Sequence, residues 1–165
     1  MRRTRRKGPV PRLSVLALGV VCLTSCAGSV DVKTALQVTD VSTGWFDAGV
    51  VDGKNKLVPS VTFRLKNGSD RDLSAIALNV MFKFADNDDV HDEVFKQRVV
   101  LENKQTELIT VRSQVGFTGE PPQTRLEMLQ NRSFRDQDAV ILVRQGAAQW
   151  ITLHRVRVER KLLTE

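Results

Sequence analysis

The sequence predicts an all-β fold, a single antiparallel β-sandwich of about seven strands with at most one short helix. Three observations lead to this prediction. Short stretches of alternating apolar and polar residues recur along residues 32–159, a period of two that is typical of half-buried strands. Clusters of Gly, Asn, Asp and Ser separate these stretches. Only one stretch has apolar residues at helical spacing, which favours a sandwich over a mixed fold.

The first half of the domain contains the clearest predicted strands. We expect extended chain at residues 32–41, 42–46, 57–66 and 73–84, with turns at 52–55 and 67–70. Residues 57–66 and 73–84 alternate most regularly and are predicted to pair as a hairpin. Because proline cannot donate to a strand ladder, Pro59 suggests an edge strand or a first position. The side chains predicted to face inward are Val61, Phe63, Leu65, Ile76, Leu78, Val80 and Phe82.

The second half adds four strands and the single helix. We expect strands at residues 94–101, 106–112, 139–145 and 150–159, and loops at 86–93 and 116–122. Leu126 and Leu129 have helical spacing, with Thr124 as a cap, so residues 124–130 are the predicted helix. A turn at Gly146 joins the last two strands. Ile151 and Leu153 differ in parity from Val156 and Val158, which predicts a bulge or two-sided burial near His154.

The N-terminal segment has the composition of an export signal. A basic start precedes an apolar run at residues 13–23, which is shorter than the roughly 20 residues that cross a bilayer. The run ends in Leu23-Thr24-Ser25-Cys26, which resembles the lipobox of bacterial lipoproteins. This resemblance implies a lipid on Cys26 and cleavage between Ser25 and Cys26. Residues 1–25 are then the signal peptide, 26–31 a tether and 32–165 the β-sandwich domain. The alternatives are an uncleaved anchor, ordinary signal cleavage and twin-arginine export.

Removal of the signal changes the charge of the protein. Six of the 25 Lys and Arg residues lie in residues 1–25, so the mature chain has 19 basic and 19 acidic residues. The high isoelectric point therefore does not indicate nucleic-acid binding. Cys26 is the one cysteine left after cleavage, so we expect a domain without disulfides that depends on its apolar core.

The mature domain resembles the small immunoglobulin-like or late-embryogenesis-type sandwiches of bacterial envelope proteins. The residues that carry this resemblance are the strand with Val61, Phe63 and Leu65, the Asn67-Gly68-Ser69 turn, and the stretch from Leu73 to Val80. Such domains are mostly binding or assembly modules, and the resemblance brings no catalytic residues with it.

Two regions are candidates for chemistry or binding. His91 lies among five acids, but this spacing fits no known calcium loop, so a solvated hairpin tip is favoured over a cation site. The last hairpin carries Trp150 with Arg155, Arg157 and Arg160, and Arg144 is expected to join them. Charge protection of an edge strand is the favoured interpretation of these arginines, and Trp150, Arg155, Arg157 and Arg160 are the candidate interaction surface.

These observations predict a membrane-anchored lipoprotein of the cell envelope that acts as a non-enzymatic binding or assembly module. The alternatives are a hydrophobic-ligand or lipid-handling domain and, third, a metal-assisted hydrolase that uses His91 and His154. We expect no cofactor, no catalytic residues and no nucleic acid, but a membrane contact through Cys26 and an envelope protein partner. The expected location is the periplasmic face of the outer membrane in an organism with two membranes, and otherwise the outer face of the cytoplasmic membrane.

Overall fold

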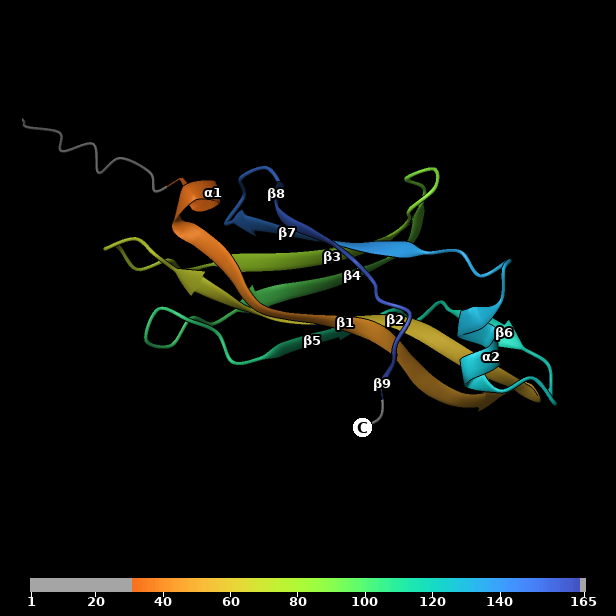
Figure 1. The fold of residues 1–165 in the computed structure, drawn as a ribbon. Coiled ribbons are helices and arrows are strands. Elements are labelled where there is room, and N and C mark those ends of the chain that lie inside the picture. The colour runs from red at the N-terminus through yellow and green to blue at the C-terminus, as the bar shows by residue number, and fades with distance from the viewer. Residues whose placement is uncertain (1–30, 164–165) are drawn as a thin grey trace, which may run out of the picture.

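Two β-sheets lie face to face in the computed structural model, which describes residues 31–163 (Figure 1). The predicted signal peptide, Ser25, Cys26 and nearly all of the tether fall outside these residues, so their roles remain predictions. The described chain is mostly strand and contains two short helices. The expectation of an all-β, two-layer domain is therefore confirmed.

The first sheet has five strands and includes the longest strand pair. Its order is β5-β2-β1-β9, and β6 pairs with β2 beyond the end of β5. Its strands are β1 (Leu36–Val51), β2 (Lys54–Asn67), β5 (Ile109–Arg112), β6 (Phe117–Gly119) and β9 (Leu162–Leu163). Asp52 and Gly53, both with positive φ, form the tight turn between β1 and β2. This confirms the predicted turn at residues 52–55.

The second sheet has four strands in the order β4-β3-β7-β8, all antiparallel. The strands are β3 (Ile76–Phe84), β4 (Val90–Val99), β7 (Gln137–Gln145) and β8 (Ile151–Arg157). The predicted last hairpin is confirmed as β7 and β8, with Gly146 at its turn. The predicted irregularity is also present, because the pairing shifts between Ile141–His154 and Leu142–Thr152 and leaves Leu153 as an extra residue.

Helix α2 (Arg125–Gln130) confirms the predicted helix and its cap. The Thr124 hydroxyl accepts from the Glu127 backbone N–H, and the Glu127 carboxylate accepts from the backbone N–H of Thr124 in return. Helix α1 (Val32–Ala35) contradicts both the strand predicted from residue 32 and the limit of one helix. Asp31 caps this single turn, which buries Val32 and Ala35 at the end of the sandwich.

Three details of the predicted sheet are wrong. The described residues contain nine strands rather than about seven, because β6 and β9 are too short to show alternation. The sheets are not purely antiparallel, since β9 runs parallel to β1. Stretches 57–66 and 73–84 do not pair as a hairpin: β2 and β3 lie in different sheets and face each other across the core.

Pro59 lies in a central strand, although its missing N–H suggested an edge. It falls where β5 stops pairing with β2, after Ser60–Arg112, and before β6 begins at Leu57–Phe117. At this break the Pro59 carbonyl accepts from the Ser113 N–H. A proline is tolerated here because the ladder on this side of β2 is already interrupted.

The core between the sheets confirms the predicted inward faces. All seven predicted core side chains are at most 1% exposed. Trp45 and Leu57 are fully buried among them, as are Ala139 and Ile141 from β7. Burial of this amount of apolar surface is the main stabilising contribution in a domain without disulfides.

Single side chains link the two sheets at both long edges of the sandwich. On one edge the Thr43 hydroxyl of β1 donates to the Arg157 carbonyl and accepts from the Glu159 N–H. On the other edge the Asp92 carboxylate of β4 accepts from the Ser113 hydroxyl and the Gln114 N–H. The sheets are thus held in register by polar contacts as well as by the core.

Gly44 of β1 allows the C-terminal strand to approach closely. A Cβ at this position would lie 2.7 Å from Leu163 Cγ and 2.9 Å from the Lys161 carbonyl oxygen. The neighbouring Trp45 N–H donates to that carbonyl over 2.7 Å. Separately, none of the helices in residues 31–163 has the length and hydrophobicity needed to cross a membrane.

Candidate functional site

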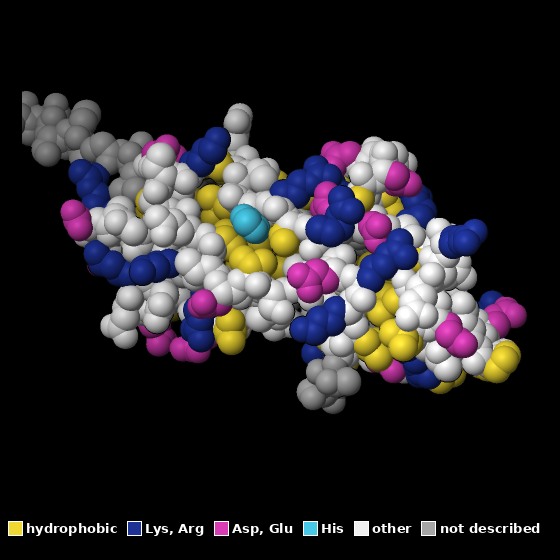
Figure 2. Space-filling model, in the orientation of Figure 1, with side chains coloured by type: hydrophobic (Ala, Val, Ile, Leu, Met, Phe, Trp, Pro, Cys, Tyr) yellow, Lys and Arg dark blue, Asp and Glu magenta, His cyan; other side chains and the backbone are white. Residues whose placement is uncertain are grey.

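The four predicted surface residues of the last hairpin do not form one continuous surface. Trp150 lies just before β8, at the end of the sandwich that also holds α1. Arg155 and Arg157 lie along β8, and Arg160 follows it. Figure 2 shows basic and acidic side chains interspersed on the face of the molecule drawn there, rather than a continuous basic stripe.

Arg155 and Arg157 are occupied by carboxylates of their own domain. Both bind Asp138 of β7, whose side chain is only 10% exposed. Arg155 also binds Asp88 in the turn between β3 and β4, over 2.7 Å. The hydrogen bonds from Lys83 and Arg155 lower the pKa of Asp88. These two arginines therefore connect β8 to β7 and to the β3–β4 turn. Their charges are neutralised within the domain, so they are less available to a binding partner than the sequence suggests.

Arg160 is a structural clamp between the end of β8 and the segment after α2. Its Nε donates to Asp136 over 2.7 Å, and its two terminal nitrogens donate to the carbonyls of Leu129 and Phe134 over 3.1 and 3.0 Å. The guanidinium also lies 5.3 Å from the centre of the Phe134 ring. Its contacts belong to the fold, and it lies away from Trp150.

Trp150 is part of a cluster of aromatic and basic side chains on the outer face of the second sheet. The Arg144 guanidinium lies 4.8 Å from the Trp150 ring and 5.9 Å from the Phe95 ring, and the two rings meet edge to face at 5.8 Å. Phe95 of β4 is 46% exposed. Arg98, also on β4, is exposed beside them. We call Phe95, Arg98, Arg144 and Trp150 the aromatic–arginine patch.

The arginines of the aromatic–arginine patch differ from those at positions 155, 157 and 160 because no carboxylate in the described part of the chain neutralises them. Within residues 31–163, neither Arg98 nor Arg144 forms a salt bridge, whereas Arg155, Arg157 and Arg160 all do. A hollow of about 530 Å³ lies between Phe95, Arg98 and Arg144, with the small residues Ala75 and Ala77 at its base. Large aromatic rings and arginines around a hollow are the side chains that dominate binding energy at protein interfaces.

Sequence reasoning found part of this patch and missed the rest. It singled out Trp150 and named Arg144 as an associate. Phe95 and Arg98 were not selected, because they lie in a strand far away in the sequence. The available signal was Phe95 itself, a large apolar residue between Val94 and the charged Lys96.

The patch shares one end of the sandwich with the start of the described chain. Leu36 pairs with Asn67, and Ile76 pairs with both Val99 and Gln145, so these strand ends lie together. Two backbone hydrogen bonds, Gly68 N–H to Ala35 and Gly146 N–H to Ala75, connect α1 to the turn before Trp150 through the loop between β2 and β3. Figure 1 shows α1 and the β7–β8 turn at the same end.

His91 packs against two phenylalanine rings. Its ring stacks on Phe117 at 5.9 Å and meets Phe84 edge to face at 4.8 Å. Burial lowers the pKa of His91, which outweighs the nearby Asp92 carboxylate. No group of three potential metal ligands occurs among the residues that the structure describes.

The acidic turn near His91 is exposed at the tip of the β3–β4 hairpin, in line with the interpretation as a solvated hairpin tip, and its acids also form ion pairs. Arg135 binds Asp86 over 2.7 Å, and Lys83 binds Asp88 over 2.9 Å. The hydrogen bond from Arg135 lowers the pKa of Asp86. The acids of this turn hold it against β3, β8 and the segment before β7.

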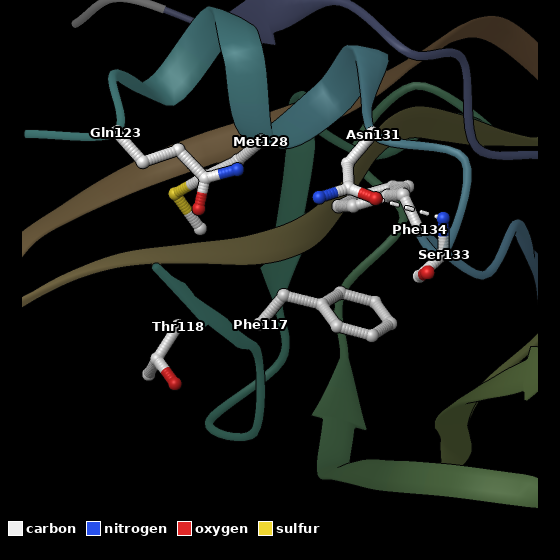
Figure 3. A pocket seen from close by; sticks show the side chains of 7 residues that line it. All are labelled: Phe117, Thr118, Gln123, Met128, Asn131, Ser133 and Phe134. Atoms are coloured by element: carbon white, nitrogen blue, oxygen red, sulfur yellow. Dashed lines mark hydrogen bonds between the residues drawn. The ribbon is translucent and has the colours of Figure 1, made fainter. Parts of the chain in front are cut away.

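The opposite end of the molecule has a second depression, between β6 and α2 (Figure 3). Its volume is about 170 Å³. Seven residues line it: Phe117, Thr118, Gln123, Met128, Asn131, Ser133 and Phe134. None of the seven is charged. We call it the α2 pocket.

Comparisons with known proteins do not assign this chain to a family. No protein-family model, curated protein sequence or solved structure matches it significantly. Its function must therefore be inferred from the surfaces described above.

Proposed function

We propose that this protein is a lipid-anchored, non-enzymatic binding module of the cell envelope, and that the aromatic–arginine patch is its working surface. The anchoring part rests on the lipobox-like Leu23-Thr24-Ser25-Cys26. The binding part rests on one observation: among the described residues, Arg98 and Arg144 have no acidic partner, while both arginines of β8, Arg155 and Arg157, are paired. The finer assignment of the fold, an immunoglobulin-like sandwich typical of binding modules, belongs to this proposal.

The chemistry of the patch favours a partner protein with an acidic, partly apolar segment. Two guanidinium groups without partners offer charge-assisted hydrogen bonds to carboxylates. Phe95 and Trp150 offer apolar surface beside those charges, and Arg144 is already oriented by its stacking on Trp150. A carboxylate that enters the hollow next to Ala77 has room to meet both arginines, because alanine leaves the sheet surface low there.

Anchoring at Cys26 keeps this surface near the membrane. Four residues separate Cys26 from Asp31, the first described residue, and the five residue steps between them span at most about 18 Å when extended. Because the patch lies at the same end of the sandwich as α1, we propose that its partner is a membrane-associated envelope protein. The proposed location is the periplasmic face of the outer membrane in a two-membrane organism, and otherwise the outer face of the cytoplasmic membrane.

Photo-crosslinking from the patch tests the binding proposal. A benzoylphenylalanine placed at Phe95 in the full chain, expressed in its native envelope, is expected to give one dominant protein adduct. The adduct should be lost in Arg98→Glu and Arg144→Glu variants and kept in Arg132→Glu, an exposed control at the opposite end. Crosslinks to lipid alone would identify the patch as a membrane contact and refute a protein partner. Adducts unchanged by both patch reversals would refute the role of the arginines.

A separate experiment tests the anchor. Cys26→Ser is expected to release the protein from the membrane fraction or to leave it unprocessed, because serine lacks the sulfur atom to which the lipid would be attached. Normal processing and membrane retention against high salt in Cys26→Ser would contradict the lipoprotein assignment without affecting the patch.

A further inference from the structure

We propose that the α2 pocket is a second binding site and that its ligand is a neutral sugar ring, such as one unit of a glycan chain. This inference is independent of the aromatic–arginine patch, which lies at the other end of the sandwich. It rests on the composition of the pocket, the free hydrogen-bonding groups around it and the rigidity of its floor.

The floor of the α2 pocket is apolar and aromatic. Phe117 and Phe134 lie with ring centres 4.6 Å apart, tilted by 41°, and Met128 of α2 adds a thioether beside them. Phe134 and Met128 are buried, so the half-buried Phe117 presents most of the exposed ring surface, and the C–H face of one sugar ring packs favourably on such a ring. Hydroxyl groups at the edge of the sugar ring remain available to polar side chains at the rim.

The rim supplies four neutral polar side chains. Gln123 and Asn131 contribute amides, each with two donors and an acceptor, and Thr118 and Ser133 contribute hydroxyls. In the described part of the chain, one of these side-chain groups is engaged: the Asn131 carbonyl oxygen accepts from the Ser133 N–H over 2.8 Å. Figure 3 shows the Gln123 and Asn131 amides on opposite sides of the pocket. Paired donors and acceptors of this kind suit neighbouring hydroxyls, which both donate and accept.

Charged ligands fit this site poorly because no residue that lines it is charged, and four of the charged side chains near it are paired with one another. Lys54 binds Glu120 over 2.8 Å, and Arg125 binds Asp47 over 3.0 Å. The Glu127 carboxylate is used in the N-terminal cap of α2. An anionic or cationic ligand would therefore find no free counter-charge among the residues that line the pocket, whereas a neutral one needs none.

The pocket floor is preorganised by the core beneath it. Phe117 and Phe134 both contact the fully buried Trp45, at ring-centre distances of 5.5 and 4.6 Å. Phe117 also stacks on His91. A floor held in this way loses little conformational freedom when a ligand binds, which favours affinity. The volume of about 170 Å³ is below the range of roughly 300–1,000 Å³ typical for drug-sized ligands, so the site suits one ring rather than several.

Gly119 shows how closely the pocket wall is fitted. A Cβ there would lie 2.7 Å from Met128 Sδ and 2.8 Å from Gln123 Oε1. Gly119→Ala therefore forces both side chains to move, which changes the pocket without adding charge. The substitution offers a way to alter the site by shape alone.

Binding of a chitotetraose probe to the full-length, detergent-solubilised lipoprotein tests the proposal, measured by calorimetry and by saturation-transfer NMR. We expect millimolar or tighter binding that weakens about three- to tenfold in Gln123→Leu and in Thr118→Val, since each variant loses one hydrogen bond. Gly119→Ala should weaken it further. Matched controls are Gln105→Leu and Thr152→Val, exposed positions outside the pocket, which should bind as the parent does.

Two results would overturn the proposal. One is no detectable binding of chitotetraose or of a neutral glucose oligomer at 10 mM to a protein whose circular dichroism spectrum and melting temperature are those of a folded domain. The other is binding that Gln123→Leu, Thr118→Val and Gly119→Ala leave unchanged. Because Arg98→Glu and Arg144→Glu do not touch this pocket, loss of the patch's function in those variants leaves the sugar site testable on its own.

Discussion

Replacing Arg160 tests whether this residue belongs to the fold or to an interface. Arg160→Ala removes two good hydrogen bonds to backbone carbonyls, a long one of 3.5 Å to the Asn131 carbonyl, and one to a carboxylate. A hydrogen bond from a charged group contributes about 1.5–3 kcal/mol when buried, but this side chain is 38% exposed, so about 1 kcal/mol for each is a fairer estimate. The expected loss is about 2–3 kcal/mol, a large share of the roughly 5–15 kcal/mol that stabilises a domain.

Differential scanning calorimetry measures this loss directly. For a domain of this size each kcal/mol lowers the melting temperature by about 3–5 °C, so Arg160→Ala should melt roughly 6–15 °C below the parent. Arg160→Lys should recover little, because an ammonium group cannot reproduce the planar fork that reaches both carbonyls. Arg157→Ala is the control: Asp138 keeps its bond to Arg155, so a change of about 0–1 kcal/mol is expected.

The result that refutes the clamp is an Arg160→Ala protein that melts within 1 °C of the parent. Full recovery by lysine would also refute it, since the geometry of the guanidinium would then be irrelevant. If the protein is stable but its crosslinked partner is lost, Arg160 belongs to an interface, as the sequence alone suggested.

Three further predictions follow from the core, the C-terminal strand and His91. Phe82→Ala should lower the free energy of unfolding by about 3–5 kcal/mol in urea titrations, because the ring is fully buried; a loss below 1 kcal/mol would contradict the packing. Gly44→Ala should displace Leu163 and speed amide exchange of β9 and Trp45, while the exchange of β3 and β7 stays unchanged. Burial lowers the pKa of His91 below its ordinary 6.5, so the unfolded chain binds the proton more readily and stability should fall as the pH drops through 6.5. His91→Phe should flatten this fall between pH 7 and 5, and an unchanged fall would contradict the assignment to His91.

The sequence predicted which face of each strand is buried more accurately than it predicted which strands pair. Alternation in residues 57–66 and 73–84 identified which side chains are buried, because burial on one face is a local property of a strand. It could not show which strands pair, and the Asn67-Gly68-Ser69 turn was interpreted as a hairpin although the chain crosses there to the other sheet. Short strands such as β6 and β9 contain too few residues to show any period.

In the candidate site, too, local features were predictable from the sequence, whereas contacts between distant segments were not. Trp150 was identifiable because large aromatic residues are rare in this chain, and the parity change around His154 correctly indicated the bulge at Leu153. The role of Arg160 was not identifiable, since the carbonyls that it binds come from residues about 30 positions earlier. The α2 pocket was also missed, because its polar residues are ordinary loop residues until the fold gathers them over Phe117 and Phe134.

The long pairing of β1 with β2 has a mechanical consequence for an anchored protein. Twelve residue pairs join the two strands, and β1 begins at Leu36, immediately after α1. A force applied through the N-terminal segment along the strand direction loads these pairs together in shear, so many hydrogen bonds must break at once. The same force across the strands would open the pairs one after another at a much lower load. If the proposed lipid anchor holds the domain at this end, the β1–β2 pairing resists a pull between the membrane and a ligand bound at the opposite end, where the α2 pocket lies.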